Sequence, residues 1–86
     1  MGNMIEKVNK DDFIINKRAG DMAVIDKIDK KGYIHFKYYY GKMFDKLKNT
    51  DNYTLQENYL KFWDFCNDDE KNNMVKIINN EKAFRD

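Results

Sequence analysis

The sequence predicts a small α+β protein in which a three-stranded antiparallel sheet packs with two to three helices, the last two forming a C-terminal helical hairpin. Two observations support this fold class. Runs of aromatic and β-branched residues separated by glycine-containing turns fill the middle of the chain, which is typical of strands. Helix-capping residues followed by apolar residues at helical spacing fill the C-terminal part. A chain of 86 residues is expected to form one domain over residues 1–86.

The three expected strands cover residues 22–28, 33–40 and 42–47, with a turn at 29–32 that ends on a glycine. The run from 33 to 40 has the strongest strand character. If side chains alternate there, the core face holds Ile34, Phe36, Tyr38 and Tyr40. The opposite face, turned to solvent or to a partner, then holds Tyr33, His35, Lys37 and Tyr39.

The segments Gly20-Asp21-Met-Ala-Val-Ile-Asp26 and Lys31-Gly-Tyr-Ile-His-Phe36 resemble the first strands of small SH3-like barrels. The likeness covers about a quarter of the chain and is a fold-level analogy, which implies an SH3-like form of the predicted sheet. Before this region, residues 9–20 have the caps of a short helix, with Asn9 at the start and Gly20 at the end. An extended segment is the alternative, because residues 13–15 (Phe-Ile-Ile) also favour strands.

Two capping boxes predict the C-terminal helices. Thr54 with Glu57 precedes an expected helix over 54–66, and Asn67 with Glu70 precedes a second helix whose apolar stripe includes residues 74, 77 and 78. On a helical wheel the apolar side chains of 54–66 span an arc of about 220°, whereas one core needs a stripe of about 100°. The first helix is therefore expected to expose part of its apolar surface.

The residue inventory argues against catalysis. The chain has one histidine, His35, and one cysteine, Cys66, whereas a zinc site needs about four such ligands. The four glycines are too scattered for a phosphate-binding loop. We therefore expect no enzyme activity, no metal and no cofactor. The single cysteine and the lack of an apolar run near the first residue predict a cytoplasmic protein, and no apolar run is long enough to span a membrane.

Protein binding is the predicted function. The interface is expected on the excess apolar surface of the 54–66 helix, through Tyr59, Leu60, Trp63 and Phe65, because aromatic side chains centre protein interfaces. The partner is expected to be a second copy, giving a homodimer, or another protein. Lys, Asn, Ile, Tyr and Phe make up 45 of the 86 residues, which indicates an AT-rich gene. We therefore hypothesise a phage- or mobile-element-type inhibitor that binds a host defence or nucleic-acid-handling complex.

Nucleic-acid binding is the alternative function. Residues 27–48 contain seven lysines against two aspartates, a net charge of +5 within a chain whose total is +1. Lysines could contact phosphates while outward aromatic rings stack on bases. The candidate residues of this surface are Lys30, Lys31, Tyr33, His35, Lys37, Tyr39 and Lys42.

Overall fold

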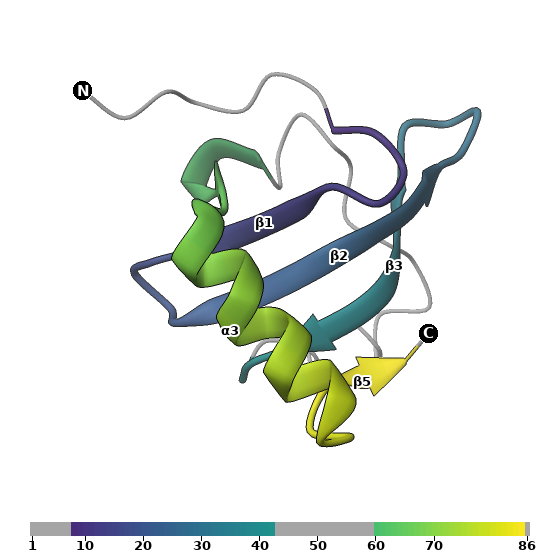
Figure 1. Cartoon of the computed structure of the whole chain (residues 1–86). Helices are drawn as coiled ribbons and strands as arrows, with labels where there is room; N and C mark the ends of the chain where they lie inside the picture. Colours follow the sequence, from purple (N-terminus) through teal and green to yellow (C-terminus); the bar gives the residue numbers. More distant parts are fainter. Residues whose placement is uncertain (1–7, 43–59, 86) are drawn as a thin grey trace.

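Figure 1 shows a computed structural model of the chain, in which residues 8–42 and 60–85 are described. Its strands are β1 (Phe13–Asn16), β2 (Asp21–Ile28), β3 (Ile34–Tyr40), β4 (Asp64–Phe65) and β5 (Phe84–Arg85). A 3-10 turn, η1 (Leu60–Phe62), precedes β4, and helix α3 (Asp68–Asn79) follows it. The strands form one antiparallel sheet of five strands in the order β4-β1-β2-β3-β5. Helix α3 crosses one face of this sheet (Figure 1).

A tight loop over residues 17–20 joins β1 to β2. The Asn16 side chain stabilises it, because its Oδ1 accepts hydrogen bonds from the amides of Arg18 (3.1 Å) and Ala19 (3.2 Å). The Asn16 carbonyl accepts a third bond from the Gly20 amide at 2.8 Å. Gly20 has a φ of +76°, a conformation that glycine adopts without steric cost. Three backbone amides of the loop are thus satisfied within the chain.

The pairing of β2 with β3 contains two irregularities. Val24 lies opposite Tyr38, but Ile25 lies opposite Phe36, so Lys37 is an extra residue on β3. Such a bulge shifts the alternation of side chains along the strand. Phe36 and Tyr39 consequently point to the same face and pack edge to face, with ring centroids 5.1 Å apart.

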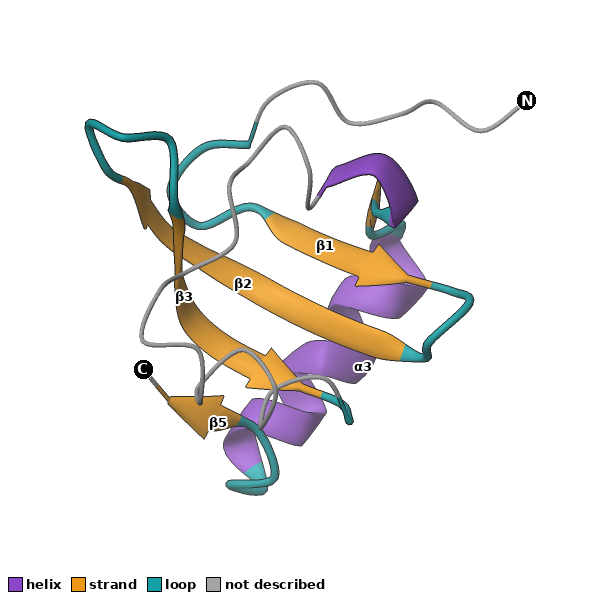
Figure 2. Cartoon of the chain, turned by 180° about the vertical axis from the view of Figure 1, so that it is seen from behind, coloured by secondary structure: helices purple, strands orange, loops and turns teal. Residues whose placement is uncertain are grey.

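The sheet has a hydrophobic cluster on each face. One cluster lies between the sheet and α3, the helix that Figure 2 shows behind the sheet. Its buried members are Met22, Val24, Cys66 and Met74. The other covers the opposite face and combines strand residues with Leu60 and Trp63 of the η1–β4 segment; its remaining buried members are Val8, Ile14, Ala23, Ile25, Ile34, Phe36 and Tyr39. The sheet is therefore the middle layer of the described fold.

Helix α3 begins as the sequence predicts. The Asn67 side chain accepts a hydrogen bond from the Glu70 amide, and the Glu70 carboxylate accepts one from the Asn67 amide, both at 2.8 Å. This reciprocal capping box satisfies two amides that a helix start leaves without partners. Met74 is fully buried against the sheet, and Ile77 and Ile78 are partly buried beside it.

The predicted fold class is wrong in its helices and its strand number. In the described residues α3 is the one α-helix, accompanied by η1, so the predicted C-terminal helical hairpin does not form there. Residues 60–66, expected in the helix 54–66, form η1 and β4 because the backbone at 64–66 hydrogen-bonds to β1, including a bond from the Cys66 amide to the Phe13 carbonyl at 3.0 Å. Residues 54–59 lie outside the described residues.

The N-terminal prediction also needs correction. The segment 9–20 is not helical, because residues 13–16 pair with β2 as a strand, so the extended alternative was right. The strands expected at 22–28 and 33–40 are observed as β2 and β3. The third expected strand, 42–47, lies outside the described residues apart from Lys42 in a turn. The predicted SH3-like, three-stranded sheet is wrong, because the described sheet has five strands. Its two edge strands are β4, near residue 65, and β5, near residue 85.

A buried carboxylate fixes the end of β3. Asp21, 1% exposed, accepts a hydrogen bond from the Tyr39 hydroxyl at 2.7 Å and one from the Lys42 amide at 3.2 Å. Gly41, with a φ of +143°, lies so close that a Cβ there would overlap the Asp21 side chain. A glycine is thus required at this position both by conformation and by space.

Replacing Gly41 with alanine should therefore lower the free energy of unfolding by about 2–4 kcal/mol, through backbone strain and overpacking. Gly20→Ala is the matched control, since its φ is also positive but nothing lies within 4 Å of the added carbon. That variant should lose about 1 kcal/mol. Urea unfolding of both variants measures the difference, and equal losses would contradict the close packing of Gly41 on Asp21.

Replacing Tyr39 with phenylalanine should lower the free energy of unfolding by about 1–3 kcal/mol, because the buried Asp21 carboxylate loses a donor. Tyr40→Phe is the control, since Tyr40 is exposed and its ring is retained. Its effect should stay below about 0.5 kcal/mol. Thermal or urea unfolding of the two single variants compares neighbouring tyrosines, and a larger loss for Tyr40→Phe would refute this role of Tyr39.

Candidate functional site

The four residues predicted to form a protein interface separate in the structure. Leu60 and Trp63 are buried in the chain's own core, at 2% and 3% exposure, and Trp63 packs edge to face on Tyr39 with ring centroids 6.0 Å apart. Phe65 is 53% exposed. Tyr59 lies outside the described residues. The predicted single aromatic surface is therefore not formed by the described residues: Leu60 and Trp63 are buried in the core, and Phe65 is exposed.

Phe62 joins Phe65 as an exposed aromatic residue, and sequence reasoning missed it. It is 56% exposed, and the predicted interface residues did not include it. The Arg18 guanidinium lies over its ring, 5.9 Å from the centroid, in cation–π geometry. We call Phe62 and Phe65 the aromatic edge. Phe62 ends η1, shortly before β4, and Phe65 belongs to β4, an outermost strand of the described sheet.

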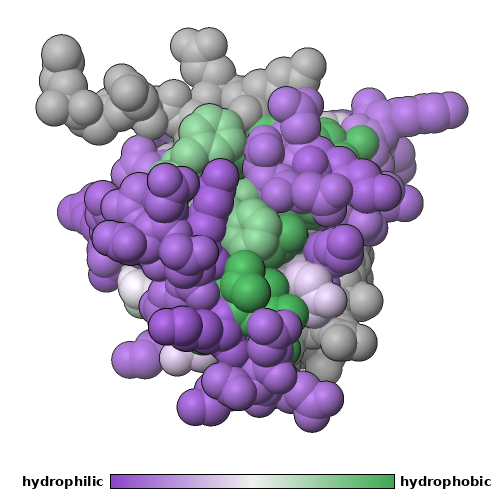
Figure 3. All heavy atoms as spheres, viewed as in Figure 1, coloured by the Kyte–Doolittle hydropathy of each residue, from purple (hydrophilic) through white to green (hydrophobic). Residues whose placement is uncertain are grey.

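Further apolar surface lies on the α3 side. A strip of hydrophobic side chains is open to solvent there between hydrophilic ones (Figure 3). Val75 of α3 is 42% exposed. Partly buried hydrophobic side chains pack around the buried cluster between α3 and the sheet; they are Phe13, Ile15, Tyr38, Ile77, Ile78 and Ala83. One helix is thus too narrow to cover this face of the described sheet completely.

The structure brings together only some of the residues predicted to bind nucleic acid. Lys30 and Lys31 lie in the β2–β3 turn, whereas Lys42 follows the other end of β3, so the strand's full length separates them. Tyr39 is fully buried because of the bulge at Lys37, and is lost as a stacking residue. Lys37 itself is exposed, and its Nζ lies 3.5 Å from the Asp11 carboxylate.

Of the remaining members of that set, Tyr33 lies where the β2–β3 turn ends and His35 lies in β3, and both are partly buried. The Asp29 carboxylate organises this turn. Its Oδ1 accepts hydrogen bonds from the amides of Lys31 (2.9 Å) and Tyr33 (3.0 Å), and its Oδ2 lies 3.1 Å from His35 Nε2. The hydrogen bond with His35, and then those with the two amides, hold the pKa of Asp29 below its ordinary value. These contacts assign His35 a structural partner.

Cys66 is buried beside the start of α3. Burial raises the pKa of its thiol to about 11, and the nearby Glu70 carboxylate adds to the increase. The thiol is therefore protonated at neutral pH and is a poor nucleophile. His35 on β3 is separated from Cys66, which follows β4, by two intervening strands of the sheet.

Among residues 8–42 and 60–85, no group of three or more His, Cys, Asp or Glu side chains is placed to hold a metal ion. The helices in these ranges include none that is long and apolar enough to cross a membrane. Comparison with protein-family models, curated proteins and solved structures gives no match to this chain. The function therefore has to be argued from the chain's own surface.

Acidification should destabilise the turn around Asp29. A carboxyl whose pKa is lowered by folding stabilises the native state above its ordinary pKa, and this contribution is lost as pH falls through the lowered value. The free energy of unfolding should therefore decrease below about pH 4. Asp29→Asn retains an oxygen for the two amides but does not ionise, so its acid-induced loss should be smaller. Urea unfolding at several acidic pH values checks this, and superimposable profiles would contradict it.

Proposed function

We propose that this chain is a non-enzymatic protein-binding module that contacts its partner through the aromatic edge. The observation that supports the proposal is the exposure of Phe62 and Phe65, each more than half accessible although the buried Trp63 lies between them in sequence. Burying a phenylalanine side chain contributes about 1.5–3 kcal/mol, so covering these two rings would stabilise a complex. Exposed aromatic side chains of this kind centre many protein interfaces.

The charges around the aromatic edge favour a protein partner over a nucleic acid. Asp64 lies between the two rings in sequence, and the first turn of α3 follows with Asp68, Asp69 and Glu70. These carboxylates lie within five residues of Phe65 in sequence, so their negative charge would repel a phosphate backbone that approaches β4. Positive charge lies at Phe62, since Arg18 covers its ring and Lys61 precedes it in sequence. This mixed surface suits a polypeptide, whose own side chains carry both signs of charge.

The module would act by occupancy. The separation of His35 from Cys66 and the protonated state of the thiol support a role without nucleophilic catalysis. Binding alone changes a partner's activity when it blocks a surface or favours one conformation. Inhibition of a host complex by a phage- or mobile-element-type protein, and a cytoplasmic location, stay predictions from composition and from the single cysteine.

Photo-crosslinking from the aromatic edge tests the proposal. A photoreactive phenylalanine analogue at position 62 or 65 should give covalent adducts with a defined protein, because each ring is exposed on the expected interface. The same analogue at Val75, which is exposed on α3, is the positional control and should give few adducts with that protein. Mass spectrometry identifies the adduct, and binding is then measured with both purified proteins.

Substitution provides the energetic test. The double variant Phe62→Ser, Phe65→Ser should bind the identified protein about 100-fold more weakly, since two aromatic contacts are lost, and should unfold at nearly the wild-type urea concentration. Val75→Ser should bind as the wild type does. If the double variant binds normally, or if adducts form equally from position 75, the aromatic edge is not the interface.

A further inference from the structure

Cationic residues from three segments that are far apart in sequence lie at one end of the described sheet. The β1–β2 loop contributes Lys17 and Arg18, the end of β3 leads into Lys42, and the segment between α3 and β5 contributes Lys82. The antiparallel pairings place these segments together, because the start of β2, the end of β3 and the start of β5 are neighbours. All four side chains belong to exposed residues.

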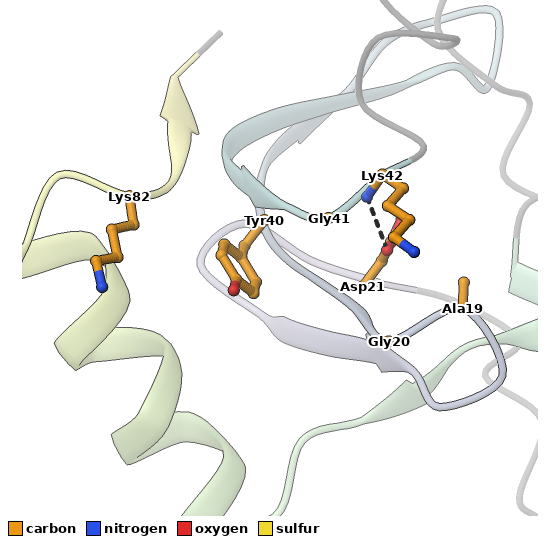
Figure 4. Close-up of a pocket in the computed structure, with 7 residues that line it drawn as sticks. All are labelled: Ala19, Gly20, Asp21, Tyr40, Gly41, Lys42 and Lys82. Atoms are coloured by element: carbon orange, nitrogen blue, oxygen red, sulfur yellow. Dashed lines mark hydrogen bonds between the residues drawn. The ribbon is translucent and has the colours of Figure 1, made fainter.

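A hollow of about 320 Å³ lies among these segments, lined by Ala19, Gly20, Asp21, Tyr40, Gly41, Lys42 and Lys82. In Figure 4 the Tyr40 ring lies between the Lys82 side chain on one side and the side chains of Asp21 and Lys42 on the other. The hollow thus has an aromatic wall, the Tyr40 ring, with one lysine side chain on each side of it. Its shape and charge suit a small anionic group.

Most other polar groups around the hollow already have partners in the chain. The Asp21 carboxylate is 1% exposed and accepts bonds from Tyr39 and from the Lys42 amide, so its oxygens are directed inward. The loop amides of Arg18, Ala19 and Gly20 donate to Asn16. A ligand would therefore be held by the Lys42 and Lys82 side chains and the Tyr40 hydroxyl.

We propose that this hollow is the subsite for a carboxylate side chain of an acidic polypeptide partner. The inference rests on the proposed protein-binding function and names the chemistry of the partner. The two ammonium groups supply the complementary charge. Arg18 connects the hollow to the aromatic edge, because it adjoins Ala19 in the loop and its guanidinium covers Phe62. The partner segment thus carries an acidic residue for the hollow and an apolar residue for the aromatic edge.

A carboxylate fits this subsite better than a phosphate. Sites that hold phosphate commonly direct several backbone amides at the anion, whereas the loop amides of this hollow donate to Asn16. Ammonium groups on long side chains instead form exposed ion pairs, which are individually weak and salt-dependent. The hollow would therefore contribute specificity and encounter rate, while the aromatic edge contributes most of the affinity.

NMR titration of the isotopically labelled full chain tests the subsite with three probes: an oligo-glutamate peptide, an oligo-glutamine peptide of equal length and an oligothymidylate. The glutamate peptide should shift the amide signals of Gly20, Gly41 and Lys82, and its affinity should decrease with salt. The double variant Lys42→Gln, Lys82→Gln should bind it about three- to tenfold more weakly. Lys42→Arg with Lys82→Arg should restore most of the binding.

The matched control is Lys30→Gln with Lys31→Gln, which removes the same charge at the opposite end of β3 and should bind the peptide as the wild type does. Equal weakening by both double variants, or equal shifts with the glutamine peptide, would refute the subsite. Stronger binding of the oligothymidylate at these signals would assign the hollow to nucleic acid instead. Self-association that buries the hollow would assign it to a second copy, and either result overturns the proposal.

These outcomes are separable from those of the crosslinking test. If adducts form from positions 62 and 65 but the lysine variants bind the identified partner normally, the protein-binding function stands and the acidic subsite is wrong. If the lysine variants bind the glutamate peptide more weakly while positions 62 and 65 give no adducts, the acidic subsite is supported and the aromatic edge is not part of the interface.

Discussion

The hydrogen bond from the Tyr39 hydroxyl to the buried Asp21 carboxylate fixes the end of the sheet on which the exposed surfaces depend. A carboxylate that is out of water needs donors, and Tyr39 and the Lys42 amide supply them. The same tyrosine packs on Trp63, which belongs to the segment that carries the aromatic edge. Gly41 allows the backbone to pass against the carboxylate. The hydrogen bond therefore links β2 to the end of β3, and the packing of Trp63 on Tyr39 links both strands to the η1–β4 segment.

Features that depend on residues close together in sequence were predicted, and features that depend on pairing between distant segments were not. The capping box of Asn67 and Glu70 involves neighbours in sequence, and it was predicted correctly. The strands at 21–28 and 34–40 were also found, since aromatic and β-branched residues are concentrated there. The burial of Tyr39 was missed, because it depends on a bulge created by pairing with another strand. Alternation along one strand carries no information about such a shift.

The segment 60–66 was misassigned for a related reason. Leu60 and Trp63 are three residues apart, a spacing that places two side chains on one side of either an α-helix or a 3-10 turn. Local sequence therefore does not distinguish the two. Pairing with β1 determines the conformation of this segment, because residues 64 and 65 become extended when they hydrogen-bond to the edge of β1. The capping signal at Thr54 and Glu57 lies outside the described residues.

The positions of charges were predictable in sequence but not in space. The basic block 27–48 was read as one surface, yet the β2–β3 hairpin sends Lys31 and Lys42 to opposite ends of β3. Conversely, Arg18, Lys42 and Lys82 are far apart in sequence and adjoin one end of the sheet. A linear count of charge measures composition, whereas an electrostatic surface depends on which loops the strand pairing brings together.

The exposure of the aromatic edge follows from the same geometry. Leu60 of η1 and Trp63, which follows η1, both lie on the inward side, so Phe62 is directed away from the core. Phe65 lies opposite Ile14 and therefore on the same face of the sheet, where Ile14 is fully buried. Phe65 is more exposed because β4 is the outermost strand, beyond which the described core does not extend. A two-residue edge strand can anchor its segment without covering its own side chains, which leaves these rings available to a partner.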